Sequence, residues 1–216
     1  SKEEDIKYIW HPCSQMKDYE TLPLIPIKSG KGVYLEDFEG NTFIDAISSW
    51  WVNIFGHSNE KINQALIDQA SQLEHVIFAG FTHQPAITLA KKLVSLTPEP
   101  LQKFFFADNG SSAIEVALKM SFHYFKNQGK VKPLFISLEN SYHGETLGAL
   151  AIGDVALYKE TYNEMMIRSI QAKSPSLHNE QVALDDMESI LKQHAHEVSA
   201  VIIEPLVQCA GSMKMY

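Results

Sequence analysis

The stretch Leu134-Phe135-Ile136-Ser137-Leu138, followed by Glu139-Asn140-Ser141-Tyr142-His143-Gly144, decides the fold. Its first half is a short apolar run, typical of a strand that is buried on both faces of a parallel sheet. Similar runs stand at residues 103–107 and 200–203, and amphipathic helices are expected at about 113–126 and 184–194. Buried strands that alternate with helices predict an α/β fold, with a mostly parallel sheet and helices on both faces.

The first hundred residues have a different pattern. Residues 1–31 contain three prolines and no clear periodicity, which predicts an irregular arm. Two alternating apolar runs, 32–38 and 42–45, flank a glycine turn and predict a β-hairpin. Helices are expected at 59–74 and from Pro85 to about residue 97, where Thr97-Pro98-Glu99-Pro100 ends the second one.

Composition narrows the class of protein. The chain has 216 residues, 45% of them hydrophobic and 20% charged, so it has enough apolar material for a folded core. The net charge is −8 and Arg168 is the only arginine, which argues against a nucleic-acid surface. Two cysteines, Cys13 and Cys209, are too few for a disulfide framework. The sequence also lacks a run of about 18 apolar residues, which a membrane helix would need. The charged start lacks a signal-peptide pattern, so we expect a cytoplasmic protein without membrane or nucleic-acid partners.

Ligands of parallel α/β sheets bind beyond the carboxyl ends of the strands, so the residues that follow each predicted strand are the candidates for a site. After residues 103–107 comes Asp108-Asn109-Gly110-Ser111-Ser112, which leads into a helix. Small residues, hydroxyl groups and the first N–H groups of a helix favour a phosphate. The alternative is that Asn109 or Ser111 simply caps the helix.

Two further strand ends carry polar or aromatic side chains. Tyr142 could stack on a planar ligand, and His143 could titrate near neutral pH. In the alternative interpretation Tyr142 packs at the edge of the core and His143 is solvated. Glu204 follows the third apolar run directly, with Gln208 close behind, and either could serve only as a structural hydrogen-bond partner. Together the three strand ends predict a pocket at one edge of the sheet.

The sequence resembles the class III, fold-type I, pyridoxal-phosphate-dependent aminotransferases from about Trp10 to Tyr216. The resemblance rests on motifs that occur in the family's order: Trp10-His11-Pro12, Gln15-Met16-Lys17-Asp18, Ser48-Ser49-Trp50-Trp51, Phe55-Gly56-His57, Ala107-Asp108-Asn109-Gly110-Ser111, Tyr142-His143-Gly144 and Ile203-Glu204-Pro205 with Gln208. It implies the fold-type I architecture, with pyridoxal 5'-phosphate as cofactor.

The resemblance also implies roles for individual residues at the cofactor. Gly110 and Ser111 would hold its phosphate, and Tyr142 would stack on its pyridine ring and border the substrate. Glu204 and Gln208 would lie near the cofactor and support the residues that touch it.

For the substrate, the resemblance implies that Trp50 and Trp51 line a pocket for a long apolar keto acid. The alternative is that both tryptophans are plain core. We expect an extended segment here, in which neighbouring side chains point to opposite sides, so burial of both in the core is disfavoured.

The paired tryptophans and the Trp-His-Pro arm further imply the activity. It is transfer of an amino group from S-adenosylmethionine to 8-amino-7-oxononanoate, which gives 7,8-diaminononanoate in biotin synthesis, by a homodimer. Two residues depart from the family pattern: Cys13 stands in place of an aromatic residue, and Glu145 in place of aspartate. The first leaves lysine open as an alternative amino donor. The motifs are also compatible with an ω-amino-acid or diamine transaminase, and with a catalytically inert fragment that only dimerises.

No catalytic residue is assigned within the chain. The family's Schiff-base lysine, and the carboxylate that pairs with the ring nitrogen, are expected beyond Tyr216. We therefore expect the chain to be the amino-terminal half of a longer enzyme. Residues 1–58 would form the arm and hairpin segment of the small domain, and residues 59–216 the first part of the large cofactor-binding domain.

Overall fold

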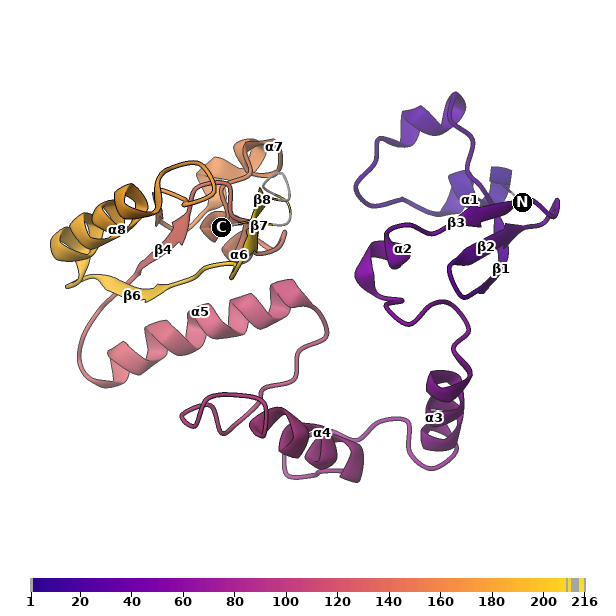
Figure 1. Ribbon diagram of the computed structural model, residues 1–216, viewed down its shortest axis with the longest axis horizontal. Helices are drawn as coiled ribbons and strands as arrows, with labels where there is room; N and C mark the ends of the chain where they lie inside the picture. Colours follow the sequence, from indigo (N-terminus) through magenta and orange to yellow (C-terminus); the bar gives the residue numbers. More distant parts are fainter. Residues whose placement is uncertain (1, 209, 211–213, 216) are drawn as a thin grey trace. The chain divides into compact units, whose positions relative to one another are not determined.

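A computed structural model describes residues 2–208, 210 and 214–215 of the chain (Figure 1). Contacts divide the chain into two compact units, residues 1–91 and 92–216, each of which is described by itself. Cys209 lies outside the described residues. Across the described part of the chain, none of the helices has both the length and the apolar character needed to cross a bilayer. The predicted boundary between residues 58 and 59 concerns the domains of a complete enzyme and stays a prediction.

The first unit combines short helices with a small antiparallel sheet of order β1-β2-β3. Its elements are α1 (Lys2–Tyr8), a 3-10 helix (Met16–Glu20), β1 (Ile27–Lys31), β2 (Tyr34–Asp37), β3 (Thr42–Ile44), α2 (Ser48–Trp51), α3 (Glu60–Ala70) and α4 (Gln84–Val94), the last of which crosses the boundary between the units. The hairpin prediction is confirmed, since β2 and β3 pair with Tyr34 opposite Ile44. The prediction that residues 1–31 are irregular is wrong at both ends of the segment, where α1 has three acidic residues in its first turn and β1 pairs with β2. The role of the segment as an arm stays a prediction.

The second unit contains a parallel sheet of order β5-β4-β6. Its elements are α5 (Gly110–Asn127), β4 (Leu134–Leu138), α6 (Leu147–Ile152), α7 (Ala156–Lys159), a 3-10 helix (Glu160–Met165), β5 (Ser169–Ala172), α8 (Glu180–His194), β6 (Val198–Val201), β7 (Val207–Gln208) and β8 (Lys214–Met215). The predicted strand at 134–138 is confirmed residue for residue. The strand predicted at 200–203 lies slightly earlier, although Ile202 still donates its N–H to the Ile136 carbonyl at 2.8 Å.

Helices cover both faces of the parallel sheet, as Figure 1 shows for α5 and α8. Alternate residues of β4 face α8, where Leu134, Ile136 and Leu138 pack with Met187, Ile190 and Leu191. Phe135 points to the other face and packs with Leu118 of α5 and Ile152 of α6. All five residues of β4 are buried, so its continuous apolar run reflects packing on both sides.

Two parts of the sequence prediction fail in the second unit. Residues 103–107 do not form a strand, because a strand needs a hydrogen-bonded neighbour and the described sheet does not include this run. The apolar side chains of this run indicate a tendency to be buried, but they do not show that its backbone pairs with another strand. Phe105 is 68% exposed in this chain. Conversely, β5 and α6 lie between residues 139 and 183, where the sequence pattern predicts neither a helix nor a strand. β5 is too short to show alternation, and α6 has four consecutive buried residues and therefore no helical period.

Candidate functional site

The amino terminus of α5 is the first candidate element. Asn109 caps it, since its side-chain oxygen accepts a hydrogen bond from the Ser112 N–H at 2.8 Å. The Ser112 hydroxyl bonds to Asp108 and is the main cause of the lowered pKa of that carboxyl. Within the described residues, no acceptor binds the N–H of Gly110 or Ser111, and a Cβ on Gly110 would meet nothing within 4 Å. The capped helix therefore still has two N–H donors without an acceptor among the described residues.

The loop after β4 lies against this helix terminus. Ser111 Oγ accepts a hydrogen bond from the Glu145 N–H at 3.2 Å, which leaves its own O–H hydrogen able to donate elsewhere. Gly144 has a φ of +125°, and a Cβ at this position would lie 2.9 Å from Ser111 Cβ. Only glycine satisfies both conditions, so Gly144 brings the loop after β4 against the amino terminus of α5.

Tyr142 is held at both its backbone and its hydroxyl. Its N–H donates to Glu204 Oε2 at 2.9 Å, which ties the loop after β4 to the chain that follows β6. Its hydroxyl donates to Glu145 Oε1 at 3.1 Å, and its ring makes an edge contact with Tyr158 at a centroid distance of 5.9 Å. Ser111, Tyr142 and Glu204 thus bring together the amino terminus of α5, the loop after β4 and the segment after β6.

Glu115 is a residue of this site that sequence reasoning missed. Its Oε1 accepts hydrogen bonds from the Thr146 hydroxyl at 2.6 Å and from the Gly148 N–H at 2.8 Å. This carboxylate of α5 therefore caps the amino terminus of α6, which follows the Tyr142 loop. No local motif signals the contact, because the partners are more than 30 residues apart.

His143 does not behave as predicted. It is only 9% exposed, and burial lowers its pKa to about 4. The prediction that it titrates near neutral pH is therefore wrong, as is the solvated alternative. Its Nε2 has no hydrogen-bond partner among the described residues. The imidazole is a neutral, buried group beneath the loop.

Gln208 is fully buried and links three segments of the second unit. Its Oε1 accepts from the hydroxyls of Ser174 at 2.9 Å and Ser176 at 2.5 Å, and its Nε2 donates to the Glu139 carbonyl at 2.7 Å. These bonds connect the carboxyl ends of β4 and β5. Its geometry fits a support for the site, while its proximity to a cofactor stays a prediction.

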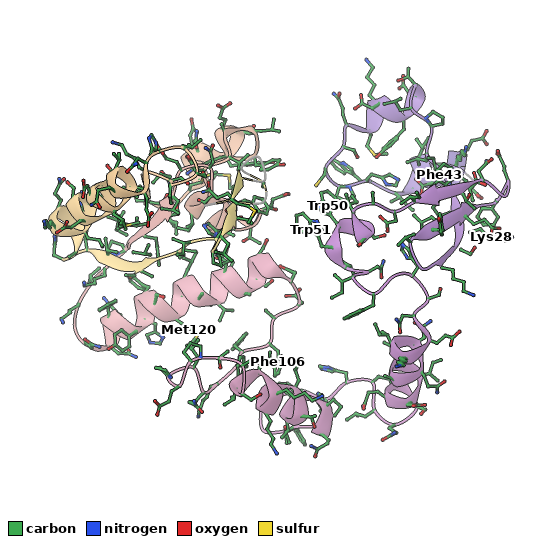
Figure 2. The ribbon with its side chains drawn as sticks, viewed as in Figure 1. Lys28, Phe43, Trp50, Trp51, Phe106 and Met120 are labelled. Atoms are coloured by element: carbon green, nitrogen blue, oxygen red, sulfur yellow. The ribbon has the colours of Figure 1, made fainter. Side chains whose placement is uncertain are left out.

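Trp50 and Trp51 belong to the first unit, and their backbone is not extended as predicted. Both lie in α2 with positive φ values of 64° and 69°. They are 59% and 56% exposed, so the interpretation of both as plain core is wrong. Figure 2 marks the two side chains on this turn. Their role at a substrate stays a prediction.

The edge of the sheet offers the donor set that a phosphorylated planar ligand needs. The α5 terminus supplies N–H groups, the helix dipole and one hydroxyl for a phosphate. Tyr142 supplies an aromatic ring whose position is fixed from two sides. Among the described residues, no cluster of three or more His, Cys, Asp or Glu could hold a metal ion. The residues present therefore fit pyridoxal phosphate, which carries both a phosphate and an aromatic ring.

Known proteins share this chain's sequence and architecture. The adenosylmethionine-8-amino-7-oxononanoate aminotransferase of Helicobacter pylori is 51% identical over 215 residues, covering 98% of this chain and 49% of the relative. The same-named protein of Aquifex aeolicus is 40% identical over 97% of the chain and 49% of its own length. A crystal structure of the Methanocaldococcus jannaschii protein of that name has a TM-score of 0.93 at 37% identity, covering 100% of this chain and 49% of that one.

An omega transaminase of Pseudomonas jessenii is also similar, with a TM-score of 0.88 at 26% identity over 99% of this chain and 50% of its own. The chain spans about half the length of the curated relatives it matches. These neighbours confirm the predicted fold-type I transaminase architecture, of which the chain contains part. The sequence profile described as aminotransferase class-III matches residues 15–216. The chain therefore belongs to the class-III aminotransferase family.

Proposed function

We propose that the whole protein transfers an amino group from S-adenosylmethionine to 8-amino-7-oxononanoate and forms 7,8-diaminononanoate for biotin synthesis. The names of relatives that are 36–51% identical to this chain support the proposal. Trp50 and Trp51 support it from the chain's own residues, because two exposed indoles offer a broad apolar surface to a substrate with a long hydrocarbon chain.

The observation that carries the proposal is the joining of the α5 terminus, the loop after β4 and the segment after β6 by two hydrogen bonds, from the Tyr142 N–H to Glu204 and from the Glu145 N–H to Ser111 Oγ. In our proposal the Gly110 N–H and the Ser111 N–H and hydroxyl bind the phosphate of pyridoxal phosphate. When bound, this cofactor supplies an electron-accepting ring for reactions at the carbon that carries the amino group. Tyr142 stacks on the ring and keeps it in one orientation.

The remaining assignments complete the proposal. Glu204 and Gln208 support the site through Tyr142 and through the strand ends, without touching the reacting atoms. The enzyme is a cytoplasmic homodimer. Cys13, which is exposed, lies in the arm that would face the amino donor, so the donor is the part of the reaction that the sequence pattern specifies least.

The test uses the full-length protein that contains this chain, loaded with pyridoxal phosphate. It is incubated with 8-amino-7-oxononanoate and, in separate reactions, with S-adenosylmethionine, lysine or a simple ω-amino acid. We expect 7,8-diaminononanoate, identified by mass, with S-adenosylmethionine as donor. Diamine formed only with lysine would overturn the donor assignment. Transamination of simple amines, with the oxononanoate left unreacted, would overturn the substrate assignment.

A further inference from the structure

The segment that carries the two tryptophans has an uncommon backbone. All four residues of α2, Ser48 through Trp51, have positive φ values between 47° and 69°. Residues with a Cβ rarely adopt this left-handed region, because the Cβ approaches the following carbonyl oxygen, and consecutive examples are rarer still. None of the four is glycine, so contacts from outside the turn must hold it in place.

The side chain of Asp45 makes two such contacts. Its Oδ1 accepts a hydrogen bond from the Ser49 N–H at 2.9 Å, and its Oδ2 accepts from the Ser49 hydroxyl at 2.7 Å. The carboxylate is 7% exposed, and these bonds, led by the one from the Ser49 N–H, lower the pKa of Asp45 to about 2. Charge-assisted hydrogen bonds, donated by the N–H and the hydroxyl of Ser49 to an ionised carboxylate, fix the centre of the turn.

His57 holds the carboxylate from the other side. Its Nε2 lies 2.8 Å from Asp45 Oδ2. The backbone of His57 pairs with that of Gly32 through two hydrogen bonds, of 2.8 and 3.0 Å. A Cβ on Gly30 would lie 2.9 Å from the His57 ring, so the imidazole packs tightly on strand β1. The turn is thereby fastened to the hairpin through His57 and Asp45.

We propose that Asp45, oriented by His57, is a positioning residue that sets the arrangement of Trp50 and Trp51 for recognition of the apolar keto-acid substrate. The inference rests on the proposed function for the identity of that substrate. The left-handed turn itself does not depend on it. In this proposal Asp45 acts through Ser49 and the backbone of the turn.

The test compares Asp45→Asn with two double variants of the full-length enzyme. Asparagine keeps the size of the side chain but loses the charge and one acceptor. In Asp45→Asn/Ser49→Gly, glycine adopts the left-handed conformation without steric cost, so the turn should form again without the Asp45 carboxylate. In Asp45→Asn/Ser49→Ala, alanine gains no such freedom. Asp37→Asn is the matched control, because Asp37 binds two backbone N–H groups of the neighbouring hairpin turn and none of α2.

Two readouts are independent of each other. The first is the exciton-coupled circular dichroism of the neighbouring indoles, taken as the difference from Trp50→Phe in each background; it requires no substrate. The second is the kinetics with 8-amino-7-oxononanoate. If the Asp45 carboxylate determines the fraction of molecules whose turn is in the substrate-binding conformation, Asp45→Asn should raise KM on the order of tenfold. It should leave kcat nearly unchanged.

We expect Asp45→Asn to lose both the exciton-coupled signal (the couplet) and the low KM. The added Ser49→Gly should restore both and the added Ser49→Ala should not, while Asp37→Asn should retain both. An unchanged couplet in Asp45→Asn, or equal behaviour of the glycine and alanine doubles, would overturn the proposal. If Asp45→Asn does not fold, His57→Ala removes one contact and should weaken the couplet partially; no change there also overturns it. An enzyme inactive on the oxononanoate refutes the substrate assignment, and the couplet still decides the role of Asp45.

Discussion

The Tyr142 loop and the Trp50 turn present aromatic side chains by opposite means. The Tyr142 loop follows a fully buried strand and precedes a helix with four buried residues, so the core fixes both of its ends. The Trp50 turn contains no buried residue and has a strained backbone that is held by hydrogen bonds, two of them to the Asp45 carboxylate. Burial supports the first and local polar chemistry the second. The two regions should therefore respond differently to substitution and to pH.

Substitution of Gly144 should give the largest effect and break the core-supported loop. Gly144→Ala combines a strained φ with a collision against Ser111, which together should destabilise the second unit by about 2–5 kcal/mol. Gly129→Ala is the matched control, since Gly129 also has a positive φ, of +73°, but its Cβ would meet nothing within 4 Å. It should cost about 1 kcal/mol. Denaturant unfolding of the full-length protein measures the loss of unfolding free energy in both variants. Equal losses would show that the contact with Ser111 does not contribute to the effect.

The buried His143 should make the same region sensitive to acid. Its folded-state pKa of about 4 lies below the ordinary value of 6.5. Above pH 6.5 His143 is neutral in both the folded and the unfolded chain, so the free energy of unfolding has its full value. Between pH 6.5 and 4 only the unfolded chain takes up the proton, so the free energy of unfolding should fall by up to about 3 kcal/mol. His143→Gln should flatten this part of the pH profile, and identical slopes for the two proteins would refute the burial of a neutral imidazole.

Glu115 offers a smaller test of how α6 begins. Glu115→Ala leaves the Thr146 hydroxyl and the first N–H groups of α6 without their acceptor, which should cost about 2 kcal/mol. Glu188→Ala is the control, because its ion pair with Lys192 is exposed and should be worth less than about 0.5 kcal/mol. Thermal unfolding of both variants provides the measurement. A loss at residue 115 no greater than that at residue 188 would contradict the capping role.

The sequence predicts the core-supported region far better than the strained one. The run at 134–138 and the Asn109 cap follow from local apolar pattern and capping chemistry, so both could be predicted. The contacts of Glu115 with Gly148 and of Glu204 with Tyr142 span 33 and 62 residues and leave no local sequence signal. The left-handed turn contradicts the intrinsic backbone preference, because serine and tryptophan favour negative φ. Its support comes from Asp45, four residues before Ser49, and from His57, which contacts Asp45 across twelve residues.

Residues 103–107 show the reverse case, in which an apolar pattern predicts a strand that the described sheet does not contain. Apolar periodicity reports which side chains tend to be buried, while strand formation also depends on a paired backbone. His143 fails for a related reason: its ordinary pKa is a property of the free side chain, and only the packing of the loop shows that burial lowers it.

The most direct test of the account is whether Ser111 recognises a phosphate. Binding of pyridoxal phosphate and of pyridoxal, which lacks the phosphate, is titrated by absorbance in the full-length protein and in Ser111→Ala. Ser121→Ala, on the same helix with its hydroxyl bonded to the Ala117 carbonyl, is the control. We expect Ser111→Ala to weaken pyridoxal phosphate about tenfold and pyridoxal hardly at all. Equal weakening of both ligands, or no difference from Ser121→Ala, would contradict the assignment of the α5 terminus as the phosphate site.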